Sequence, residues 1–100
     1  MFIVGCAKLW QGADAEAVVW LRRSIGANRN YALAHFQLAA AFAYLSELDE
    51  ARAAAQAGLA LQPSFTVRRY RANAPSSHPV YLAGRERVYE GLRMAGVPEG

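Results

Sequence analysis

The chain has 100 residues, of which 54% are hydrophobic, 19% charged and 11% aromatic. This length suits one small domain and excludes a multidomain enzyme, and a content of only four prolines argues against a disordered chain. The formal net charge is +3, and the excess of arginine begins at Ser64, because residues 1–63 hold equal numbers of basic and acidic side chains.

The first residues show neither a membrane span nor an export signal. The longest apolar run, residues 1–7, ends at Lys8 and is far shorter than the roughly 20 residues that cross a bilayer. A secretory signal requires a basic residue before its apolar run, and none precedes this one. Cys6 is the single cysteine, which excludes an internal disulfide or thiolate metal cage and is typical of a reducing compartment. We therefore expect a cytoplasmic protein.

Segments rich in alanine and leucine, with apolar residues three and four positions apart, predict amphipathic helices along the whole chain. No segment shows the alternation that is typical of a strand. Glycine and proline mark several helix ends, at Gly12, Pro63 and Gly96, and Asp49 opens a helix with an acidic first turn. We predict helices over residues 2–11, 14–26, 31–45, 49–61, 64–72 and 79–95.

The chain resembles itself when it is shifted by 34 residues. The shift aligns Val4-Gly5 with Leu38-Ala39, Trp10 with Tyr44, Gly12 with Ser46, and Glu16-Ala17 with Glu50-Ala51. A helical period of 34 residues is that of the tetratricopeptide (TPR) family. Ala39 and Ala51 stand where paired helices of that family approach closely. Gly58 stands where a small residue would leave room for the next repeat, and Pro63 stands where the repeat ends.

The resemblance predicts an all-α, TPR-like α-solenoid of two helical hairpins with a C-terminal capping helix pair. We expect a single domain, with a truncated first repeat over 1–31, a second repeat over 32–65 and capping helices over 66–100. The last segment is not a third repeat, because Arg85 stands where a small residue is needed and Pro75 and Pro79 interrupt the first helix.

The sequence contains no catalytic constellation. His35 and His78 lie far apart, and no metalloprotease, hydrolase, nucleotide-binding or paired-cysteine motif occurs. The glycines mark helix contacts and helix ends, and Cys6 follows the close-contact Gly5, which favours a packed small residue over a reactive thiol. We therefore expect no enzymatic activity, no metal site and no cofactor.

Stacked TPR hairpins form a curved array whose inner surface is lined by the first helix of each hairpin. The resemblance places the following residues in a partner-binding groove: Phe2, Cys6, Leu9, Trp10, Leu33, Phe36, Ala40, Ala43 and Tyr44. Because these side chains are nearly all apolar, the groove fits an amphipathic helix or another domain of the same protein. The alternative is that they only pack against the neighbouring hairpin.

Five arginines in the last third form a predicted basic patch: Arg68, Arg69, Arg71, Arg85 and Arg87. Clustered cations of this kind are needed for contacts with the phosphates of a nucleic acid. Glu86 and Glu90 lie among them, however, which is typical of a solvated helix face with ordinary ion pairs. A capping or domain-docking surface is therefore favoured over a nucleic-acid interface.

Almost the whole chain resembles the C-terminal TPR segment of bacterial class III adenylate cyclases and related transcription regulators. The resemblance lies in residues 20–25, 27–31, 33–36, 63–71 and 89–99. In that family the repeats follow a catalytic or DNA-binding domain and serve as sensory or interaction modules, and none of the cyclase's catalytic residues has a counterpart here. The resemblance implies a free-standing module, a gene remnant or a segment of a longer protein.

We therefore predict a protein–protein interaction module with a regulatory or scaffolding role and an unidentified protein or peptide partner. The alternatives are a small nucleic-acid-associated protein that uses the arginine-rich last third, and a structural remnant without a partner. The first hairpin has no preceding repeat to cover its apolar residues, which include Phe2, Ile3, Leu9, Trp10 and Trp20. Such a patch predicts a homodimer in which the N-terminal hairpins pair about a two-fold axis.

Overall fold

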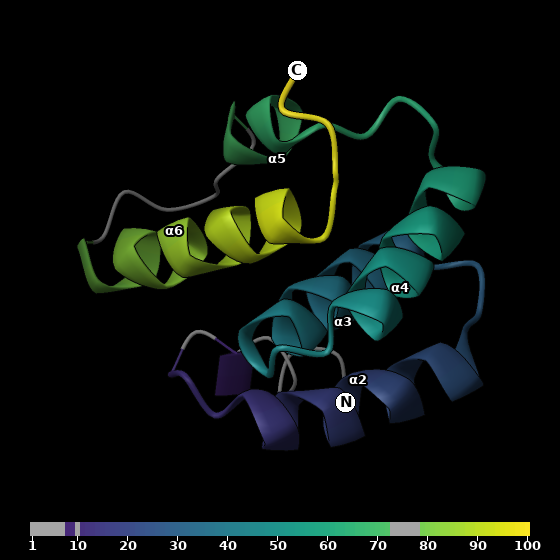
Figure 1. Ribbon diagram of the computed structural model, residues 1–100, viewed down its shortest axis with the longest axis horizontal. Helices are drawn as coiled ribbons and strands as arrows, with labels where there is room; N and C mark the ends of the chain where they lie inside the picture. The colour runs from purple at the N-terminus through teal and green to yellow at the C-terminus, as the bar shows by residue number, and fades with distance from the viewer. Residues whose placement is uncertain (1–7, 10, 73–78) are drawn as a thin grey trace.

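The computed structural model describes residues 8–9, 11–72 and 79–100, and within these ranges it is helical and contains no strand. Its helices are α2 (Asp14–Ala27), α3 (Ala32–Tyr44), α4 (Leu48–Leu61), α5 (Val67–Ala72) and α6 (Pro79–Met94) (Figure 1). The all-helical prediction is confirmed for these residues. The predicted helix over 2–11 lies outside them except for residues 8 and 9, which are helical, and residue 11, which belongs to a turn. None of the described helices has the length and apolar character to cross a membrane.

The prediction that the fifth helix begins at residue 64 was wrong. This helix, α5, begins at Val67, and the hydroxyl of Thr66 accepts a hydrogen bond from the backbone N–H of Arg69 at 3.1 Å. A side-chain oxygen that caps the first turn in this way marks the true start of a helix. The preceding residue, Phe65, is buried with its ring stacked on that of Phe36 at 3.8 Å, so the segment before α5 is held by the core instead.

The 34-residue period of the sequence is also a period of the backbone. Helices α2 and α4 each have 14 residues, and they begin and end 34 residues apart. The turns before them share a left-handed residue, Gly12 with φ 84° and Ser46 with φ 62°. Each of these residues donates its N–H three residues back, to Leu9 and Ala43 respectively. The two turns therefore repeat one local geometry.

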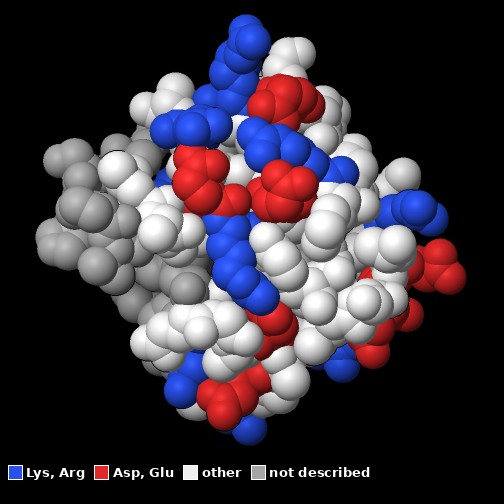
Figure 2. Space-filling view, turned by 60° about the vertical axis from the view of Figure 1, so that its left-hand side comes forward, with Lys and Arg blue, Asp and Glu red and all other residues white. Residues whose placement is uncertain are grey.

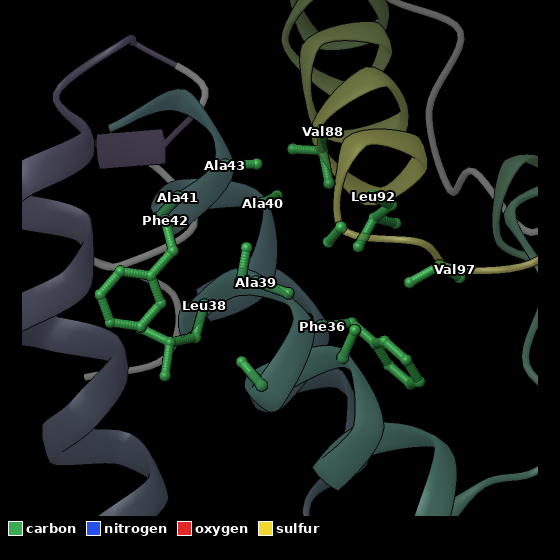
Figure 3. Packing of buried hydrophobic residues seen from close by; sticks show 14 of the residues in the cluster. Phe36, Leu38, Ala39, Ala40, Ala41, Phe42, Ala43, Val88, Leu92 and Val97 are labelled. Carbon is green, nitrogen blue, oxygen red and sulfur yellow. The ribbon is translucent and has the colours of Figure 1, made fainter. Parts of the chain in front are cut away.

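Helix α3 lies at the centre of the molecule, and α2, α4 and α6 each pack against it (Figure 1). Ten of its 13 residues are buried, because its sequence is apolar on all sides. A helix without a polar face is stable in water only when neighbours surround it. Figure 3 shows Leu38 and Phe42 directed toward α2, and Ala40 and Ala43 toward α6.

Two glycines allow the helices to approach α3 closely. A Cβ atom at Gly58 of α4 would lie 2.8 Å from the ring of Phe36, and one at Gly91 of α6 would lie 2.9 Å from the Cβ of Ala40. Gly58 was predicted to leave room for a following repeat, but the space beside it is filled by Phe36 of its own hairpin. Ala39 and Ala51, the predicted close-contact alanines, are fully buried.

The C-terminal tail returns to the start of α5. The N–H groups of Val67 and Arg68 donate to the carbonyls of Pro98 and Glu99 at 2.9 and 2.8 Å, which satisfies first-turn donors that have no partner within a helix. The side chain of Arg93 donates to Glu99 at 2.7 Å and lowers the pKa of that carboxyl. The contribution of this interaction to stability is present above the ordinary glutamate pKa and is lost as the pH falls through the lowered value.

Candidate interaction surface

The predicted groove residues of the second hairpin are not on an open surface. Phe36, Ala40 and Ala43 are buried, whereas Leu33 and Tyr44 are half-buried. In the first hairpin, Leu9 is fully buried, and Phe2, Cys6 and Trp10 lie outside the described residues. The predicted dimer patch shares these residues: Phe2, Ile3 and Trp10 lie outside the described part, and Trp20 is half-buried.

Helix α6 covers this inner face of α3. Val88 and Leu92 of α6 are fully buried and are directed toward Ala40 and Ala43 (Figure 3), and Gly91 between them brings the two backbones together. The apolar side of α6 therefore packs against residues that were predicted to line the groove. The groove was expected to accept an amphipathic helix or another domain of the same protein, or only to pack against the neighbouring hairpin, and here α6 of the same chain covers Ala40 and Ala43.

A partly buried ion pair joins α6 to α2. The guanidinium of Arg87 donates to both carboxylate oxygens of Asp14, at 2.6 and 2.8 Å, and to the carbonyl of Leu9 at 3.1 Å. The Asp14 side chain is only 10% exposed and that of Arg87 28%. The hydrogen bond to Asp14 raises the pKa of Arg87 above its ordinary value. A bidentate pair of this kind fixes the relative orientation of the two side chains and also strengthens their interaction.

Tyr44 connects the same pair to α3. Its hydroxyl donates to the backbone carbonyl of Arg87 at 2.7 Å, and the Arg87 guanidinium lies 3.7 Å from the centre of its ring. Burial raises the pKa of the Tyr44 hydroxyl, although the charge of Arg87 opposes this shift. The neutral Tyr44 hydroxyl therefore contributes fully to the stability of the fold below the ordinary tyrosine pKa of about 10. This contribution is lost as the pH rises through the raised pKa.

The five arginines of the predicted basic patch do not share one surface. Arg85 is 4% exposed, and Arg87 belongs to the pair with Asp14. Arg71 forms an ion pair with Glu86 at 2.6 Å, whereas Arg68 and Arg69 are exposed. The prediction of a solvated face with ordinary ion pairs was therefore wrong for Arg85 and Arg87. Figure 2 shows that acidic and basic groups are interspersed on the face that it displays.

We expect this distribution of charge to support only weak, sequence-independent binding to nucleic acid. Fluorescence anisotropy with short DNA duplexes of different sequence should show binding that falls steeply as the salt concentration rises. The physical reason is that buried and paired arginines cannot neutralise phosphates. Submicromolar binding to one sequence at about 0.15 M salt would contradict this expectation.

Within the described residues, no group of three or more histidine, cysteine, aspartate or glutamate side chains is placed to hold a metal ion. Comparisons with protein-family models, curated proteins and solved structures found no significant match for this chain.

No local pattern in the sequence indicated that Arg87 pairs with Asp14, because the two residues are 73 positions apart. The sequence did contain a weak indication that α6 packs closely on another helix. Val88, Gly91 and Leu92 are three and four positions apart, which places a small residue between two aliphatic ones on a single helix face. This arrangement is typical of a helix that packs closely on another helix.

Proposed function

We propose that the chain is a non-enzymatic protein-interaction module of TPR type, and that the inner face of α3 binds an amphipathic helix. The 34-residue period shared by α2 and α4 and by the turns before them supports the repeat. The observation that carries the binding proposal is the packing of α6 against α3, because this face of α3 already holds an amphipathic helix. A regulatory role in a cyclase-like signalling protein is the specific form that the sequence resemblance suggests.

The contacts of α6 define the chemistry of the partner helix. It presents a small residue at the place of Gly91, where Ala40 leaves no room for a Cβ atom, and aliphatic residues at the places of Val88 and Leu92. It also carries a cation at the place of Arg87, opposite the carboxylate of Asp14. In the resting chain α6 occupies this site, and a partner binds by displacing it. Tethering gives α6 a high effective concentration that a partner has to overcome.

A fluorescent peptide with the sequence of residues 79–100 tests this proposal. We expect a full-length Gly91→Leu variant, whose own α6 no longer fits, to bind the native peptide at least about tenfold more tightly than the wild-type chain does. The control is a peptide that carries the same Gly91→Leu change, which should bind neither protein. Circular dichroism establishes whether the variant stays helical, and the milder Gly91→Ala replaces it if it does not. A helical variant that fails to bind the native peptide would contradict the proposal.

A further inference from the structure

Large apolar side chains that remain exposed are concentrated at the two ends of the hairpin that α3 and α4 form. The two helices pack against each other and run in opposite directions (Figure 1), so the start of α3 lies beside the end of α4. Tyr31 and Leu61 lie at this end, and Leu45 and Leu48 lie at the other, where the two helices are joined; each is 38% to 42% exposed. These are four of the seven exposed large hydrophobic side chains in the part of the chain that the structure describes. Each end of the hairpin therefore presents an apolar pair to solvent.

The end with Tyr31 and Leu61 is an open groove of about 610 Å³. Leu33 and Phe65 also line this groove, and their side chains are half-buried and buried, respectively. The ring of Phe65 stacks on that of Phe36 at 3.8 Å with an interplanar angle of 11°, which fixes it against the core. The groove therefore combines a preformed apolar floor with apolar side chains that are accessible from outside.

The other end of the hairpin is a tight turn, in which residues 45–50 are all exposed. Ser46 has a φ of 62°, and its N–H and that of Glu47 donate to carbonyls in the last turn of α3 at 3.1 and 3.0 Å. This pair of backbone hydrogen bonds is the Schellman motif, which closes a helix end in one conformation. The turn therefore holds Leu45 and Leu48 in a fixed arrangement at the surface.

The two ends also carry opposite charge. The turn holds three exposed carboxylates, those of Glu47, Asp49 and Glu50. Among the described residues, only Asp49 of these three has an ion-pair partner, Arg52 at 3.8 Å. The groove is lined by the exposed Arg69, and no acidic side chain is found among the described residues that line it. Complementary charges of this kind steer association and fix its orientation more than they add affinity.

We propose that the chain associates head to tail, so that the turn of one copy binds in the groove of the next. Leu45 and Leu48 then pack against Leu61 of the next copy, and the carboxylates of the turn face its Arg69. Two different surfaces at opposite ends of one hairpin form a heterologous contact, which leaves a free end for a further copy. The predicted dimer, by contrast, pairs identical surfaces about a two-fold axis and stops at two copies. Head-to-tail association does not require α6 to move, so it is independent of whether α3 binds a partner helix.

Sedimentation velocity of the full chain at concentrations from about 10 µM to about 1 mM tests this association, because a contact of this small size is weak. We expect the average mass to rise with concentration and to exceed that of a dimer at the upper end. Leu48→Glu in the turn and Leu61→Glu in the groove should each weaken association at least about tenfold, since each places a carboxylate in an apolar contact. Leu82→Glu is the matched control, because Leu82 is similarly exposed, at 36%, and lies outside both ends. This change should leave association unaltered.

A mixture of the two variants isolates the proposed contact. The Leu48→Glu variant retains its groove and the Leu61→Glu variant retains its turn, so an equimolar mixture should form pairs of one copy each and nothing larger. Circular dichroism establishes that each variant stays helical, and Leu48→Gln or Leu61→Gln replaces a variant that does not. A wild-type chain that stays monomeric or stops at a dimer, an equal loss from Leu82→Glu, or a mixture that remains monomeric would overturn the proposal.

Discussion

Replacing Gly91 by leucine is expected to lower the free energy of unfolding by about 3 kcal/mol. A Cβ atom at this position would lie 2.9 Å from the Cβ, 3.0 Å from the Cα and 3.1 Å from the carbonyl oxygen of Ala40. Two of these atoms belong to the backbone of the central helix, which cannot move aside as a side chain can. Helix α6 must therefore shift away from α3. Urea denaturation followed by circular dichroism measures the loss.

Gly26 provides the matched control for this substitution. It lies in α2, and a Cβ atom there would meet nothing within 4 Å. Gly26→Leu should therefore be neutral or stabilise the protein by about 0.5 kcal/mol, because leucine is a better helix former than glycine. Similar effects of the two substitutions would show that close packing of α6 on α3 does not limit stability.

Breaking the ion pair between Asp14 and Arg87 is expected to cost about 2 kcal/mol. Removing one partner leaves the other charge in a site that excludes much of the solvent, since the two side chains are 10% and 28% exposed. A double-mutant cycle with Asp14→Asn and Arg87→Gln isolates the coupling between the two groups. We expect a coupling free energy of about 2 kcal/mol from urea unfolding of the four proteins.

The pair between Lys8 and Glu16 is the control for this cycle. Its atoms are 3.0 Å apart, but its side chains are 37% and 62% exposed. Solvent screening reduces an exposed pair of this kind to about 0.5 kcal/mol or less. If the Asp14–Arg87 cycle returns no larger coupling than the Lys8–Glu16 cycle, the pair does not hold α6 in place.

The sequence was sufficient to locate α2, α3 and α4 because their signals are local. The 34-residue shift aligned Gly12 with Ser46, and both residues adopt the same left-handed turn conformation. The acidic first turns of α2 and α4 and the apolar run of α3 also lie within the helices that they predict. The start of α5 was misplaced, although Thr66, a good N-cap residue, carried the necessary signal.

The packing of α6 could not be predicted in the same way, because it depends on residues far apart in the chain. Nothing near Arg87 in the sequence distinguishes it from Arg93, yet Arg87 reaches Asp14 of α2 whereas Arg93 forms exposed pairs with Glu90 and Glu99. Arg85 was expected on the surface, but the aromatic cluster of Tyr70 and Tyr89 surrounds it. These contacts arise from the tertiary arrangement.

The packing of α6 on α3 also has a consequence for biosynthesis. A ribosome makes the apolar helix α3 first and reaches Gly91 roughly 50 residues later, a delay of about 3 to 10 s at ordinary rates of translation. During this interval the face of α3 that carries Ala40 and Ala43 has no α6 to cover it. The nascent chain therefore presents an apolar surface of the kind that chaperones bind, and this surface closes only after the last helix has left the ribosome.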